Sequence, residues 1–176
     1  AVANLAKTLT NYGMGKVTFF VGERLSYPDE AIVQGSADSF CDYEGDALSV
    51  IYIENKEAEC LPSTHGVKDS AFLRDKVPMT KEEVRCVSLA KLGLKEDSVC
   101  YDVGAGTGSV SVEMALRTPK GRVYAIEKKE TAVELLKKNK QKFMTDNLSV
   151  IEGVAPEALE ALEVPTHAFI GGSSGN

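Results

Sequence analysis

The sequence contains no tryptophan and no long hydrophobic run, although 43% of its 176 residues are hydrophobic. No stretch approaches the roughly 18 consecutive apolar residues that mark a membrane-spanning helix. No secretory signal segment opens the chain, so we expect a cytoplasmic protein without a membrane partner. The length allows one domain, or one domain with a fragment of another.

Cysteine and histidine are also scarce. The two histidines, His65 and His167, are far apart in the sequence. The four cysteines are widely spaced and form no C-x-x-C pair: Cys41, Cys60, Cys86 and Cys100. These spacings argue against a zinc site and against a disulfide framework. We therefore expect free thiols in a reducing compartment and no metal site.

Positive charge is in the minority, with 20 Lys and Arg against 26 Asp and Glu, for a formal net charge of −6. Binding to a phosphate backbone needs a basic face, so this balance argues against a nucleic-acid partner. The lysine-rich stretch at residues 137–142 is typical of a solvated helix face.

The most informative stretch begins with a short apolar strand, Val99–Val103, which runs into the glycine-rich turn Gly104–Gly108. A helix-like segment follows at residues 109–116, and a second apolar strand at residues 122–126 ends in Glu127. This order is half of a nucleoside-binding α/β unit, in which the terminal acid binds the ribose hydroxyls. Glycines permit close approach of a ligand to the backbone and tolerate positive φ.

Two details indicate which nucleoside is bound. The spacing is G-x-G-x-G, and Ser109 occupies the position where a dinucleotide site has a small residue. Asp102 precedes the turn by two residues, where its charge suits a cationic ligand better than a pyrophosphate. S-adenosylmethionine fits these features, and a nicotinamide-binding oxidoreductase is the disfavoured alternative. The purely structural alternative is that the glycines serve packing and Glu127 is a solvated strand end.

From Val99 onward the pattern alternates strand and helix, with further strands at residues 148–151 and 167–170. Such alternation predicts a parallel sheet with right-handed crossovers. Ligands bind at the carboxyl ends of such strands, where residues 153–156 and 171–172 join the glycine turn and Glu127. Ala155 in the third of these loops leaves room for a flat adenine ring.

The preceding residues are harder to interpret. Apolar residues at helical spacing predict a helix over residues 1–12. Apolar runs predict strands at 17–21 and 48–53, and Ser26 is the predicted start of a second helix. The polar residues 55–64 are predicted to form a linker. Thr80 with Glu83 forms a capping-box pattern at the start of a helix that ends at Gly93. The apolar face predicted for that helix is Val84, Val87, Ser88 and Leu92.

Five separated segments together resemble the decarboxylating precorrin-6B methyltransferase family of corrin biosynthesis: Pro78–Arg85, Asp102–Glu113, Val123–Glu127, Glu152–Leu159 and Phe169–Ser173. The segment Val21–Glu30 resembles the end of a tetrapyrrole methylase, with which that family is often fused. The resemblance implies two domains. Residues 1–61 are then a partial α/β tetrapyrrole-methylase subdomain, and residues 62–176 a class I methyltransferase domain, a Rossmann-like parallel sheet that stops after its fourth strand. Both ends of the chain are expected to be cut.

The resemblance also implies the chemistry. S-adenosyl-L-methionine is the expected cofactor, and its contacts are carried over to the matching positions: Thr80, Gly104, Ala105, Gly106, Thr107, Gly108, Glu127 and Ala155. The implied reaction methylates carbon 15 of precorrin-6B or cobalt-precorrin-6B and removes carbon dioxide from a ring acetate. The upstream partner activity methylates carbon 5. The expected partners are the tetrapyrrole substrate and further copies of the chain; no catalytic base is assigned.

The substrate is polyanionic, so we expect cations around it. One hypothesis is a cationic wall made of residues that cluster near Thr80: Lys68, Arg74, Lys76, Lys81 and Arg85. The alternative is that neighbouring acids pair with these residues on an ordinary surface. An RNA methyltransferase of the same fold and an inactive cofactor-binding scaffold are the remaining alternatives for the whole chain.

Overall fold

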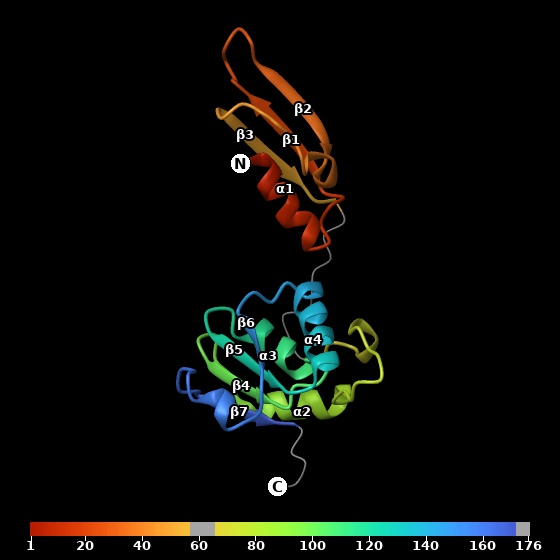
Figure 1. The fold of residues 1–176 in the computed structure, drawn as a ribbon, viewed down its shortest axis with the longest axis vertical. Helices are drawn as coiled ribbons and strands as arrows, with labels where there is room; N and C mark the ends of the chain where they lie inside the picture. The colour runs from red at the N-terminus through yellow and green to blue at the C-terminus, as the bar shows by residue number, and fades with distance from the viewer. Residues whose placement is uncertain (57–65, 172–176) are drawn as a thin grey trace. The chain divides into compact units, whose positions relative to one another are not determined.

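The computed structural model describes residues 1–56 and 66–171 (Figure 1). It contains two compact units, Ala1–Cys60 and Leu61–Asn176. Cys60, His65, Gly172, Ser173 and most of the predicted linker lie outside the described residues. No helix of the described part has the length and apolar character to cross a membrane.

The first unit is a three-stranded antiparallel sheet with one helix. Its elements are α1 (Val2–Asn11), β1 (Thr18–Glu23), β2 (Ala31–Ser36), the 3-10 turn η1 (Ala37–Phe40) and β3 (Ser49–Glu54). The strand order is β2-β1-β3. Phe19 and Val21 on β1 are buried with Val2 and Ala6 of α1, because alternate strand residues and one helix stripe face the same core.

The helix predicted to start at Ser26 is wrong. Arg24 and Ser26 have positive φ, the Tyr27 amide donates to the Arg24 carbonyl at 2.9 Å, and the Ser26 amide donates to Glu30 Oε2 at 2.9 Å. These contacts make a turn that leads directly into β2. The β-branched pair in Ala31–Ser36 favours a strand.

The second unit is built on a parallel four-stranded sheet with the order β6-β5-β4-β7, as the sequence predicted. The strands are β4 (Val99–Val103), β5 (Arg122–Glu127), β6 (Leu148–Glu152) and β7 (His167–Ile170). The helical elements are η2 (Asp69–Ala71), α2 (Glu82–Leu92), α3 (Ser109–Arg117), α4 (Glu130–Lys142) and η3 (Glu157–Leu159). Counted from β4, the order is 3-2-1-4, and β7 is an edge strand.

The helices α3 and α4 pack on the strands β4, β5 and β6, and α2 packs on α3 (Figure 1). The two crossovers from β4 to β5 and from β5 to β6 run in one direction, so right-handedness puts both helices on one face. The core between them contains Cys100, Val112, Val123 and Leu136. The connection to β7 reaches the tyrosines of the other face, since Tyr101 Oη donates to the Glu163 carbonyl at 2.7 Å.

The helix α2 differs from its prediction in two ways. It begins at Glu82 with Lys81 as N-cap and without a side-chain capping bond, so the Thr80 capping box does not form. Val84 and Val87 are 54% and 61% exposed, whereas Arg85 and Leu89 are buried. The face that enters the protein is therefore centred on a charged residue, which a hydrophobic pattern does not register.

A buried amide links α4 to the glycine turn. Asn139 is fully buried; its Nδ2 donates to the Leu73 and Thr107 carbonyls at 3.0 and 2.9 Å, and its Oδ1 accepts from the Leu73 amide at 2.8 Å. The bond to the Thr107 carbonyl is buried, and the two bonds to Leu73 are partly buried. The amide therefore fixes two irregular segments against one helix.

We expect Asn139→Leu to lower the free energy of unfolding by about 2–4 kcal/mol, because buried main-chain groups lose their partners. Chemical denaturation measures the loss. Gln141→Leu, at an exposed position of the same helix, is the control and should change stability little. A loss below about 1 kcal/mol for Asn139→Leu would contradict the assigned bonds.

Candidate functional site

The glycine turn between β4 and α3 is held against the end of β5. The amides of Gly104 and Ala105 both donate to the Ile126 carbonyl, at 2.9 and 3.1 Å. Gly104, Gly106 and Gly108 have φ of +77°, +55° and +77°, in the left-handed region that favours glycine. The alternating conformation makes the turn tight enough to start α3 at once.

Glu127 lies at the end of β5 and faces this turn. It is 8% exposed, and its Oε2 accepts from the Gly106 amide at 2.9 Å. Its Oε1 accepts from the amides of Lys128 and Lys129 at 2.9 and 3.0 Å. A carboxylate offers about four acceptor sites, so one site, on Oε2, is left by these three donors.

Two of the glycines are required by the protein's own packing. A Cβ on Gly106 would stand 2.8 Å from the Pro78 carbonyl oxygen, and one on Gly108 would stand 2.7 Å from Leu136 Cγ. The structural alternative therefore accounts for these two positions. It does not account for the orientation of Glu127, which points to the turn and not to solvent.

The other loops reach the same edge of the sheet. The Gly153 amide donates to the Glu127 carbonyl at 3.0 Å, and the Gly171 amide donates to the Val103 carbonyl at 2.9 Å. Ala155 is partly buried in the loop that begins at Gly153. The strand ends thus meet as parallel pairing requires, with Val103 opposite both Ile126 and Ile170.

Thr107 is the most enclosed residue of the turn. It is fully buried, and its Oγ1 has no hydrogen-bond partner among the residues that the structure describes. Ala105, two residues earlier, is partly buried. A buried hydroxyl without a partner is unfavourable, so Thr107 is a polar group with unused bonding capacity inside the turn.

Asp102 lies elsewhere than the sequence suggested. It is 1% exposed and accepts a hydrogen bond from Ser111 Oγ on α3, so its carboxylate faces the helix. The pKa of Asp102 is raised to about 6, mainly by burial and to a lesser extent by the charge of Glu127, while the bonds from Ser111 oppose the shift. The carboxylate is not open to a cationic ligand in this arrangement.

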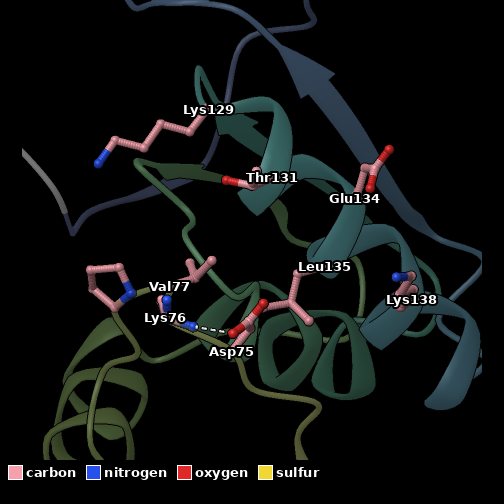
Figure 2. A pocket seen from close by; sticks show the side chains of 9 residues that line it. Asp75, Lys76, Val77, Lys129, Thr131, Glu134, Leu135 and Lys138 are labelled. Carbon is pink, nitrogen blue, oxygen red and sulfur yellow. Dashed lines mark hydrogen bonds between the residues drawn. The ribbon is translucent and has the colours of Figure 1, made fainter.

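A groove of about 440 Å³ lies beside the turn, between residues 75–78 and α4 (Figure 2). Val77, Pro78 and Leu135 contribute apolar surface. Three lysines also line the groove: Lys76, Lys129 and Lys138. None of them forms an ion pair with another residue of the described ranges 1–56 and 66–171. Asp75 and Glu134 also line it, and Asp75 Oδ1 accepts from the Lys76 amide at 2.8 Å.

The hypothesis of a cationic wall is wrong for Arg85 and stays a prediction for the other four residues. Lys76 lines the groove, and Lys68, Arg74 and Lys81 are exposed. Arg85 is fully buried and pairs with Glu113 and Asp69 at 2.8 and 2.7 Å. It cannot face a substrate, because its side chain is fully buried. The described residues contain no cluster of three or more potential metal ligands.

The strand order, the glycine turn after the first strand and the acid after the second define a class I, Rossmann-like methyltransferase domain. The sequence model of the precorrin methyltransferase domain family matches residues 70–176. This match covers more than half of the chain, and the chain belongs to that family.

Individual relatives agree. The chain is 50% identical over 111 residues to a probable cobalt-precorrin-6B C(15)-methyltransferase (decarboxylating) of Sulfurisphaera tokodaii, covering 61% of this chain and 58% of that protein. It is 41% identical to the crystal structure of precorrin-6y C5,15-methyltransferase from Geobacter metallireducens, with a TM-score of 0.61 over 65% of this chain and 60% of that one.

A third similar structure is the C-terminal domain of precorrin-6Y C5,15-methyltransferase from Rhodobacter capsulatus. It is 34% identical, with a TM-score of 0.59, and the match covers 64% of this chain and 60% of that one. The chain thus spans about 60% of the length of these relatives.

We expect Asp102→Asn to change the dependence of stability on pH. The pKa of Asp102 is raised from 3.8 to about 6, so the unfolded chain gives up this proton at lower pH than the folded one. As the pH rises from 4 to 7, the free energy of unfolding of the wild type should therefore fall by about 2–3 kcal/mol relative to that of the variant.

Denaturant unfolding at pH 4.0, 5.5 and 7.5 measures the difference between variant and wild type. Asp97→Asn, at an exposed acid before β4, is the control for removal of one carboxylate. If the two variants show the same pH dependence, Asp102 does not titrate with a raised pKa.

Proposed function

We propose that this chain is the cofactor-binding part of an S-adenosylmethionine-dependent methyltransferase of corrin biosynthesis. The observation that carries the proposal is the carboxylate of Glu127, which lies against the Gly106 amide at the carboxyl edge of a parallel sheet. A ribose held by that carboxylate lies across the glycine turn. Family membership supports the same reading.

The residues present fit the cofactor. The proposed contacts are those of the sequence analysis: Thr80, Gly104, Ala105, Gly106, Thr107, Gly108, Glu127 and Ala155. Glu127 retains an acceptor site for a hydroxyl, and the buried Thr107 hydroxyl has bonding capacity left. If both ribose hydroxyls bind to Glu127, one main-chain donor must give up its place on the carboxylate.

The cofactor supplies an electrophilic methyl group, and the chain supplies its alignment with the acceptor carbon. Orientation of two reacting groups contributes about 7–11 kcal/mol in ideal cases. Removal of carbon dioxide needs an electron sink, which the conjugated substrate provides. No acid–base residue is assigned, and the buried Asp102, which faces α3, is not a candidate.

The proposed substrate is precorrin-6B or its cobalt complex, methylated at carbon 15 with loss of carbon dioxide from a ring acetate. The names of the similar proteins support this choice. The proposal extends to the first unit, which is the end of a tetrapyrrole methylase whose activity concerns carbon 5. We further propose that the protein is cytoplasmic and homo-oligomeric.

The groove beside the turn is the proposed contact surface for substrate carboxylates. It combines apolar surface from Val77, Pro78 and Leu135 with lysines that form no ion pair among the described residues, and a macrocycle with acidic side chains has the complementary character. Pro78 also borders the glycine turn. The RNA methyltransferase alternative has no support, since the three relatives reported above are all named for corrin precursors.

Calorimetric titration with S-adenosylhomocysteine tests the cofactor site. We expect saturable binding, and we expect Glu127→Ala to weaken it at least tenfold, because a charged hydrogen bond contributes about 1.5–3 kcal/mol. Glu130→Ala, at an exposed acid that starts α4, should bind as the wild type does. Absence of binding by the folded wild type overturns the proposed cofactor site.

A second titration, with precorrin-6B in the presence of S-adenosylhomocysteine, tests the groove. Replacing Lys76, Lys129 and Lys138 with Gln should weaken substrate binding at least tenfold. The affinity for S-adenosylhomocysteine should stay within twofold of the wild-type value. The control replaces three exposed lysines outside the groove with Gln: Lys91, Lys95 and Lys137. Equal effects of the two triple variants would remove the groove from the site.

A further inference from the structure

The segment at residues 66–80, which we call the strap, contains little regular structure beyond the 3-10 turn η2. Side chains of α2, α3 and α4 bind it, and Arg85 of α2 does so at three residues. Arg85 Nη1 donates to Asp69 Oδ1 at 2.7 Å and to the Thr80 carbonyl at 2.6 Å, and Nη2 donates to the Val67 carbonyl. Both ends of the strap therefore bind to the same guanidinium.

The guanidinium is itself held in place by α3. Its Nε donates to Glu113 Oε1 at 2.8 Å, where Glu113 is 1% exposed, and the Phe72 ring lies 4.9 Å from its Cζ. Glu113 Oε2 accepts from the Gly66 amide at 3.2 Å. The acid on α3 thus balances the buried charge and contacts the first residue of the strap.

The strap lies directly on the glycine turn. The Pro78 carbonyl oxygen would be 2.8 Å from a Cβ on Gly106, and Asn139 holds Leu73 and the Thr107 carbonyl together. A shift of the strap therefore moves Pro78 and Thr80 relative to the turn. Arg85 fixes the position of the end of the strap, since it binds the Thr80 carbonyl.

We propose that Arg85 is a positioning residue, which holds residues 78–80 on the glycine turn and thereby completes the cofactor site. This inference rests on the proposed function. Buried ion pairs are weak evidence for stability, because desolvation of both charges offsets their attraction. What the guanidinium supplies is geometry: a planar fork with five donors binds several oxygens at fixed angles. A lysine at this position has three donors on one atom and cannot reproduce that set of bonds.

Titration with S-adenosylhomocysteine of Arg85→Lys, well below its unfolding temperature, tests the proposal. We expect affinity to fall at least tenfold. The control is Leu89→Ala, one turn further along α2 at a residue that is 1% exposed; it destabilises the same helix, leaves the hydrogen bonds of Arg85 to the strap in place, and should bind within twofold of the wild type. Binding by Arg85→Lys within twofold of the wild type, or an equal loss in Leu89→Ala, overturns the proposal.

Asp69→Asn provides a second variant if Arg85→Lys does not fold. It weakens one bond to the strap and leaves the pair of Arg85 with Glu113 intact, so we expect a loss of about three- to tenfold in affinity, and an unchanged affinity contradicts the proposal. Failure of the wild type to bind S-adenosylhomocysteine overturns the proposed function. If the wild type binds and both variants bind equally well, only the role of Arg85 is overturned.

Amide hydrogen exchange of the ligand-free protein gives a readout that needs no cofactor. In Arg85→Lys and Asp69→Asn, exchange at residues 66–80 should quicken at least fivefold, while β4 and β5 keep the wild-type rates. Exchange that quickens equally in the strap and the sheet indicates general destabilisation and rejects a positioning role. Exchange that stays unchanged in the strap also rejects it.

Discussion

The bond between the Glu127 carboxylate and the Gly106 amide is the contact on which the candidate site depends. It connects the end of β5 to the middle of the glycine turn, and two further amides hold the other carboxylate oxygen. Without it, the turn is attached to β5 only through the Ile126 carbonyl. Parallel register puts the other loops at the same edge, so the bond lies where those loops meet.

The turn is held from three sides by different chemistry. The strand end supplies a carboxylate, α4 supplies the neutral amide of Asn139, and the strap supplies the Pro78 backbone, anchored through Arg85. Positive φ at three glycines lets the chain pass through this small space. The result is a turn with little freedom of its own, which is what a site needs when it works by alignment.

Periodicity and short motifs predicted the parallel sheet, the glycine turn and the position of Glu127 at the end of β5, because these features depend on neighbouring residues. They did not predict Arg85 in the core, since its partner Glu113 is 28 residues away. They also missed β2, because the turn at Arg24–Ser26 depends on positive φ, and they misassigned Thr80 as a cap, because its carbonyl binds to Arg85. Asn139 had no local signal, since both segments that it joins are irregular.

The three main-chain hydrogen bonds to the Glu127 carboxylate have a consequence for the proposed cofactor site. Three of about four lone pairs on the carboxylate already accept main-chain N–H groups. A sugar diol that claims two of them must compete with the polypeptide, and the polypeptide reclaims its bond as the sugar leaves. If the proposed cofactor binds here, this competition would assist departure of the used nucleoside, and the site would exchange some affinity for faster release.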